Sequence, residues 1–106
     1  MRAMMKPQEK HNAQLPTPRG IRRACNRELY RTIKRLNVYV SPERLKEAET
    51  FYFGKVIEHL LWIHEHRSNK KKQADWWAET CAPHIASLWE VDEGALIRAF
   101  RDGYGG

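Results

Sequence analysis

The sequence predicts an all-α fold, a compact bundle of about five helices with a flexible N-terminal arm. Apolar residues recur at the spacing of one helix face through most of residues 19–102. Serine, asparagine and aspartate stand where these periodic segments begin, as helix caps do. Only Val38–Val40 favours an extended conformation. With 106 residues and 42% apolar content, the chain can form one core but not two.

The chain divides into three regions by composition. Residues 1–18 are polar and proline-containing and lack periodicity, so we expect a flexible basic and polar arm. Residues 19–102 should form a single helical domain. Residues 103–106, Gly-Tyr-Gly-Gly, should form a flexible tail.

The first helix is expected from Arg19 to Leu36. At about 100° per residue, its apolar side chains fall within about 120° of arc, and most of its basic side chains lie opposite. The apolar set is Ile21, Cys25, Leu29, Ile33 and Leu36. Asn37 follows and can end the helix, because asparagine tolerates a left-handed conformation.

The second helix should begin after Ser41 and run to about Arg67, because serine caps a helix and Pro42 suits its first position. Its main apolar stripe consists of Leu45, Tyr52, Val56, Leu60 and Ile63. Phe51, Leu61 and Trp62 lie away from that stripe. A helix with several apolar sides is either central or shared with a second chain, so we expect a homodimer.

Shorter helices should follow at about residues 71–81, 83–89 and 93–102. Pro83 suits the first turn of the middle one, and Asp92 can cap the last. The residues expected to face inward are Ala74, Trp77, Cys81, Leu96, Ala99 and Phe100.

All of the net charge lies in the first helix. Residues 19–35 contain seven basic residues and one acid, Glu28, a net +6 that equals the formal charge of the whole chain. A concentrated positive field attracts a polyanion, and the release of its counterions drives binding. The sequence pI near 9.6 agrees with a nucleic-acid binder.

The basic side of the first helix is the main candidate site. Arginine binds phosphate in a bidentate manner, and Tyr30 could stack on an unpaired base. The candidate residues are Arg19, Arg23, Arg27, Tyr30, Arg31, Lys34 and Arg35. Two alternatives stay open: a solvated face that pairs with acids such as Glu47, Glu49 and Glu58, or a docking surface for an acidic protein.

A basic triplet, Lys70, Lys71 and Lys72, precedes Trp76 and Trp77. The lysines could contact a phosphate backbone beside the arginine helix, or they could be a solvated loop end. Neighbouring residues in a helix point about 100° apart, so one tryptophan should be core and the other should point elsewhere.

Residues 84–101 resemble the helix-turn-helix DNA-binding motif. The matching positions are Ala86, Trp89, Val91, Leu96 and Ala99. The resemblance implies that the second helix of the pair contacts DNA, with Arg98 and Arg101 as candidates. The turn position that prefers glycine is occupied by Glu90, and Asp92 and Glu93 oppose phosphate at the start of that helix.

No metal site, cofactor site or catalytic motif is predicted. His59, His64 and His66 are five, two and seven residues apart, whereas a helical ligand pair needs three or four. Cys81 and His84 have that spacing but lack further ligands. The chain contains no nucleotide-binding loop, nucleophile elbow or paired carboxylates, so we do not expect an enzyme.

No apolar run is long enough to span a membrane, and residues 1–20 lack a secretory apolar segment. Cys25 and Cys81 fall on apolar helix faces and should be buried thiols, which favours the cytoplasm. The sequence therefore predicts a small basic nucleic-acid-binding regulatory protein, with DNA favoured over RNA. The alternatives are an adaptor or inhibitor that docks an acidic partner through its arginine face, and an RNA-binding protein.

Overall fold

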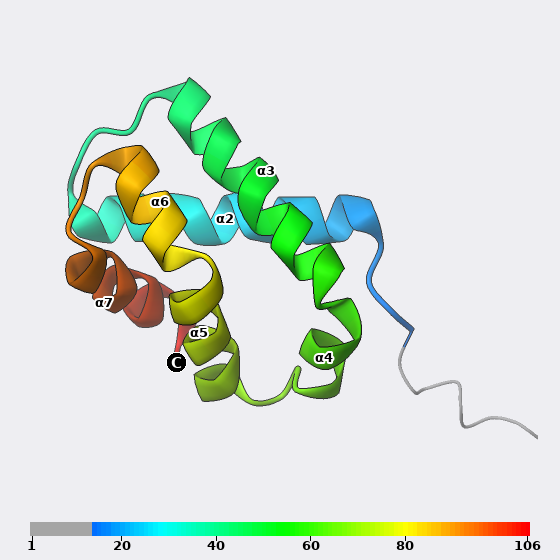
Figure 1. The fold of residues 1–106 in the computed structure, drawn as a ribbon. Coiled ribbons are helices and arrows are strands. Elements are labelled where there is room, and N and C mark those ends of the chain that lie inside the picture. Colours follow the sequence, from blue (N-terminus) through cyan, green and yellow to red (C-terminus); the bar gives the residue numbers. More distant parts are fainter. Residues whose placement is uncertain (1–13) are drawn as a thin grey trace, which may run out of the picture.

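Helix α2, Pro18–Leu36, is the long element on which the rest of the molecule is assembled (Figure 1). The computed structural model describes residues 14–106, and within this range it has six α-helices and no strand. The all-α prediction is therefore confirmed. Most of the predicted arm, residues 1–13, lies outside the described residues, and the extended segment at 38–40 is a plain connection.

Of the remaining helices, α3 and α7 pack directly on α2, and the others pack mainly on those two helices. Their bounds are α3 Pro42–Glu58, α4 Leu60–Glu65, α5 Lys70–Thr80, α6 Ala82–Trp89 and α7 Glu93–Tyr104. Helix α7 packs along α2 most extensively, and α3 crosses α2 on another side (Figure 1). Helices α5 and α6 contact α7, and α6 also contacts α3, so they close the bundle.

The predicted caps are present. The Ser41 hydroxyl accepts from the Arg44 N–H at 3.2 Å, and the Asp92 carboxylate accepts from the Ala95 N–H at 2.9 Å. Thr17 caps α2 by accepting from the Gly20 N–H at 3.0 Å, so the helix begins one residue before the predicted start. Asn37 ends α2 with φ 58°, the left-handed conformation expected of it.

The prediction of one unbroken helix from Ser41 to Arg67 is wrong. Helix α3 ends at Glu58, and His59 (φ −114°, ψ 26°) separates it from α4. The His59 ring nitrogen Nδ1 lies 3.1 Å from the Lys55 carbonyl oxygen, so the side chain bonds to the last turn of α3. The break lets α4 turn back toward α5 (Figure 1).

The core centres on two stacked rings from α5 and α7. Trp77 and Phe100 have centroids 3.8 Å apart and an interplanar angle of 2°, and Tyr52 meets both edge-on. The predicted inward residues Ala74, Trp77, Cys81, Leu96, Ala99 and Phe100 are all buried. On α2, Ile21, Cys25 and Leu29 are buried, whereas Ile33 and Leu36 are only partly buried.

The predicted tail at 103–106 needs a correction. Helix α7 continues to Tyr104, and Gly105 (φ 100°) ends it. The Tyr104 ring stacks on Phe100, one turn earlier, with centroids 5.1 Å apart. The Arg101 guanidinium donates to the Gly106 carbonyl at 3.1 Å, so the last residues of the chain contact the domain.

Candidate nucleic-acid interface

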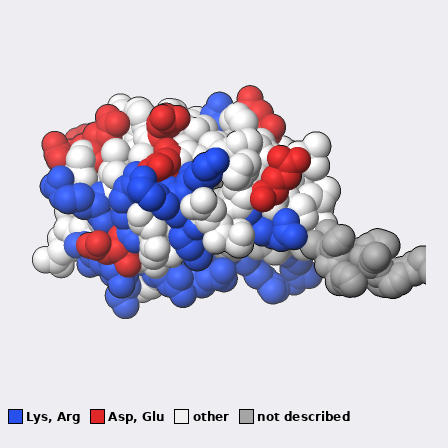
Figure 2. Space-filling model, turned by 90° about the horizontal axis from the view of Figure 1, so that it is seen from below, with Lys and Arg blue, Asp and Glu red and all other residues white. Residues whose placement is uncertain are grey.

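The outer side of α2 is a row of exposed cations. Arg19, Arg23, Arg27, Arg31, Lys34 and Arg35 are exposed, and the structure places them together as predicted from the sequence. Tyr30 lies among them with 55% of its surface accessible. Figure 2 shows basic side chains following one edge of the molecule, the side on which α2 lies. We call this surface the α2 basic face.

The cations of this face are not neutralised by ion pairs with residues 14–106. The ion pairs in that range are Arg44–Glu90, Lys55–Glu58, Lys71–Asp75 and Arg101–Asp75. Glu49, one of the acids considered as a partner, accepts instead from the Asn26 amide at 3.4 Å. Among the described residues, therefore, no acidic side chain pairs with the cations of the α2 basic face.

Glu28, the only acid on α2, points away from that face. Its carboxylate oxygen Oε1 accepts a hydrogen bond from the Tyr52 hydroxyl of α3. Burial raises the pKa of Glu28, although the hydrogen bond from Tyr52 and the charges of Arg27, Lys70 and Arg31 oppose that shift. The only acidic side chain of α2 is therefore directed toward α3 and not into the row of cations.

Contacts within the helix order part of the face. The Lys34 ammonium lies 5.5 Å from the centroid of the Tyr30 ring, and Arg35 Nη1 donates to the Arg31 carbonyl at 3.4 Å. Arg22, the seventh cation of the segment, lies over the Phe53 ring of α3 at 4.2 Å. Arg22 is thus directed to the α2–α3 contact, and six cations remain on the outer side.

The lysine triplet divides into residues with different roles. The Lys70 ammonium lies 4.1 Å from the ring centroid of Tyr104, the last residue of α7, next to Gly103, which lies beside the side chains of Arg31 and Arg35. Lys71 pairs with Asp75 at 3.2 Å. The Lys72 side chain is exposed. Lys70 can extend the α2 basic face, whereas Lys71 is already engaged.

Residues 84–101 lie in α6 and α7 and in the short turn between these helices. Ala86, Trp89, Leu96 and Ala99 are buried between α6 and α7 and their neighbours. Glu90, at the turn, has φ 57° and ψ 47°, a left-handed conformation in which glycine is normally favoured. The Trp89 indole N–H donates to the Arg44 carbonyl at 3.1 Å and joins the pair to α3.

The two arginines of α7 differ in their availability. Arg98 is exposed. Arg101 donates to Asp75 Oδ1 at 2.6 Å, and this hydrogen bond, with that of Lys71, lowers the pKa of Asp75. Arg101 is therefore occupied within the domain, and only Arg98 is placed to reach a ligand from this helix.

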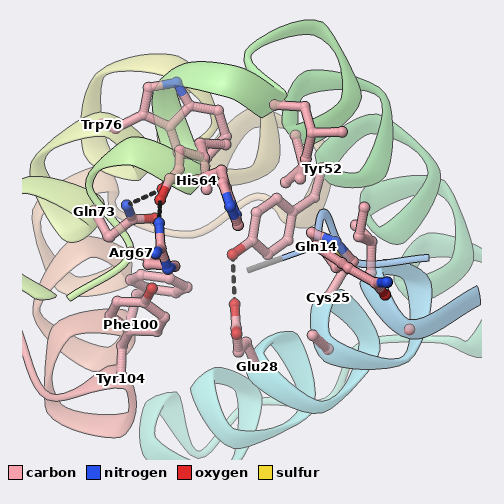
Figure 3. A pocket seen from close by; sticks show the side chains of 17 residues that line it. Gln14, Cys25, Glu28, Tyr52, His64, Arg67, Gln73, Trp76, Phe100 and Tyr104 are labelled. Carbon is pink, nitrogen blue, oxygen red and sulfur yellow. Dashed lines mark hydrogen bonds between the residues drawn. The ribbon is translucent and has the colours of Figure 1, made fainter. Parts of the chain in front are cut away.

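Sequence reasoning missed two features. Trp77 is the core member of its pair and Trp76 is half-buried, whereas the exposed tryptophan of the described residues is Trp62 at 36%, which the sequence did not single out as exposed. The second feature is a cavity of about 410 Å³ beside α2, with Glu28 and Tyr52 in its wall (Figure 3). One feature of the sequence could have indicated it. Glu28 follows Cys25 by three positions and Ile21 by seven, which places this acid on the apolar side of the helix.

Comparisons with protein-family models, curated proteins and solved structures gave no match to this chain. Between residues 14 and 106, no three His, Cys, Asp or Glu side chains are grouped closely enough to hold a metal ion. In the same range, none of the helices combines the length and the apolar composition that a membrane span requires.

Proposed function

We propose that this chain is a non-enzymatic nucleic-acid-binding protein that contacts a phosphate backbone through the α2 basic face. One observation carries the proposal: six exposed cations share one side of a helix and have no ion-pair partner among residues 14–106. At 1.5 Å per residue, the 19-residue helix is about 28 Å long, enough to follow several phosphates.

DNA is the favoured nucleic acid, and regulation is the favoured role, because of the α6–α7 pair. A helix, a left-handed turn residue and a second helix with small residues at the contact are the elements of a helix-turn-helix. Asp92 and Glu93 at the start of α7 would repel phosphate, and Arg101 is engaged with Asp75. We therefore assign most of the binding energy to α2, with Arg98 as a secondary contact.

The proposal is tested by removing two charges from the middle of the face. Arg27→Ala with Arg31→Ala should weaken binding to all duplex sequences about equally. It should flatten the slope of log affinity against log salt by roughly 0.9 for each lost contact. The control, Lys46→Ala with Lys55→Ala, removes the same formal charge from α3, although Lys55 is paired with Glu58. Fluorescence anisotropy with a labelled duplex, a single strand and an RNA hairpin measures both quantities.

The outcome also separates the alternatives. If the Arg27 and Arg31 changes leave affinity and salt slope the same as the control does, the phosphate-binding role of α2 is refuted. Preferential binding to the RNA hairpin or the single strand would favour the RNA-binding alternative, in which the exposed Tyr30 stacks on a base. Absence of binding to every nucleic acid at low salt would favour an acidic protein partner.

We also propose a homodimer, but fewer apolar side chains support it than the sequence suggested. Phe51 is covered by the His84 ring, with centroids 4.0 Å apart, so it does not serve a second chain. Leu61 (68% exposed), Trp62 and Ile57 are the apolar side chains left accessible on α3 and α4. Sedimentation at tens of micromolar tests this, and a single 12.5 kDa species would refute it. The buried thiols agree with a cytoplasmic setting.

A further inference from the structure

The cavity beside α2 has the dimensions of a small-molecule site. Its volume is about 410 Å³, within the range of about 300–1,000 Å³ in which such ligands are bound. Side chains from α2, α3, α4, α5 and α7 surround it (Figure 3). Helix α4, which follows the break at His59, contributes Leu60, Ile63 and His64 to the cavity wall.

Most of the cavity wall is apolar and aromatic. Aromatic rings come from Tyr52, Trp76, Phe100 and Tyr104, and aliphatic side chains come from Val56 and Leu60. A ligand that fills such a space gains affinity by covering these surfaces. The electron-rich faces of aromatic rings also attract a cation, an attraction that increases when the cation is desolvated.

One acid projects into this apolar space. Figure 3 shows the Glu28 carboxyl and the Tyr52 hydroxyl meeting at the cavity, with Oε1 of Glu28 accepting from Tyr52. The other carboxylate oxygen of Glu28, Oε2, has no hydrogen-bond partner among the described side chains, and it is not fully buried. It is therefore open to a donor in the cavity.

Two other polar side chains of the cavity wall are bound to backbone carbonyls, whereas the buried Trp76 indole N–H has no hydrogen-bond partner among the described residues. The Gln73 amide donates to the carbonyls of Ile63 and His66, at 3.1 and 2.9 Å. Arg67 Nη1 donates to the His64 carbonyl at 2.5 Å, and Arg67 is exposed. Glu28 is thus the acid of the cavity lining, and Arg67 is an exposed cation at the edge of the cavity.

From this arrangement we propose that the cavity binds a small aromatic amine, with the ammonium on Glu28 and the ring between the aromatic side chains. An ammonium would form a charge-assisted hydrogen bond to Oε2, which is shorter and stronger than a neutral one. It would also compensate the burial of the carboxylate. The site is separate from the α2 basic face, because Glu28 points away from that face, and it does not depend on nucleic-acid binding.

Three indoles of similar shape test the charge requirement: tryptamine, 3-methylindole and indole-3-propionate. Isothermal titration of the full chain should show tryptamine binding at least tenfold more tightly than indole-3-propionate, with 3-methylindole between them. Glu28→Gln keeps an acceptor for Tyr52 and should reduce tryptamine affinity about tenfold while leaving 3-methylindole unchanged. Val56→Phe should fill the cavity and weaken all three.

Amide chemical shifts of the wild-type chain provide a test that needs no variant. Tryptamine should shift the signals of residues around the cavity, including Glu28, Tyr52 and Trp76, more than those of the α6–α7 turn. The proposal is overturned if indole-3-propionate binds as tightly as tryptamine, which would point to Arg67 as the anchor. It is equally overturned if none of the indoles binds, or if the shifts lie outside the cavity.

Discussion

Glu90 is held in a conformation that its side chain disfavours, and this makes a quantitative test of the α6–α7 turn. Its φ of 57° and ψ of 47° are left-handed values, which cost an L-residue about 1–2 kcal/mol and glycine much less. The side chain recovers part of that cost through Arg44, whose Nη1 lies 3.3 Å from Glu90 Oε2. With side-chain exposures of 45% and 76%, that pair contributes about 0–1 kcal/mol.

The comparison of Glu90→Gly with Glu90→Ala isolates the backbone term, because both variants lose the Arg44 pair equally. Glycine relieves about 1–2 kcal/mol of strain but loses about 0.4–1 kcal/mol more chain entropy on folding. We therefore expect the glycine variant to be more stable than the alanine variant by about 0.5–1 kcal/mol. For a domain of this size, that corresponds to a difference in Tm of roughly 3–6 °C.

Chemical denaturation followed by circular dichroism measures the difference directly. Glu47, exposed in the middle of α3, supplies a control in which the order should be reversed. There glycine should be less stable than alanine by about 1 kcal/mol, since it weakens a regular helix. If Glu90→Ala proved as stable as Glu90→Gly while the Glu47 pair behaved as expected, residue 90 would not be left-handed and the turn would be wrongly described.

Further expectations concern the buried groups. Burial raises the pKa of Glu28 above its ordinary 4.5, so the stability due to this group is greatest at low pH and is lost as the pH rises. Glu28→Gln should therefore raise Tm relative to wild type more at pH 7 than at pH 4; an equal change at both would contradict this. Burial also raises the pKa of Cys25, and that of Cys81 to about 12, so neither thiol should react with a disulfide reagent at pH 8 until the chain unfolds. Fast labelling of the native protein would show that they are accessible. Phe100→Ala, which removes the ring stacked on Trp77, should cost about 3–5 kcal/mol by denaturation, and a cost under about 1 kcal/mol would contradict the described core.

The sequence predicts this fold well where local chemistry decides the structure. Ser41, Asn69 and Asp92 each accept from the backbone N–H three residues later, which is the bond that makes them good caps. The apolar period of α2 placed Ile21 and Cys25 in the core for the same local reason.

The sequence fails where tertiary contacts decide. Histidine at position 59 does not indicate the end of a helix. The contact of its ring with the Lys55 carbonyl could form whether the helix continued or ended there. The sequence predicted that Tyr104 belongs to a flexible glycine-rich tail. In the structure its ring stacks on Phe100, one turn earlier, and the helix continues to Tyr104. Both cases depend on what packs nearby.

The candidate site follows the same division. The charges of the α2 basic face could be read from residue spacing alone. The absence of ion-pair partners for these cations could not be predicted, because ion pairs form between segments far apart in the chain. Asp75, for example, pairs with Arg101, 26 positions away. The inward turn of Glu28 likewise depends on Tyr52, which α3 supplies from 24 positions away.

The central claim, that α2 binds a phosphate backbone, is tested most directly by the salt dependence of the unmodified protein. Affinity for a labelled duplex of about 20 base pairs should be measured from roughly 50 to 200 mM salt. With the six cations of the α2 basic face all engaged, log affinity should fall with log salt at a slope near −5.4, and four contacts would give about −3.6. A slope between these values is the result that the structure predicts. Binding that is absent at the lowest salt, or that does not change with salt, would contradict it.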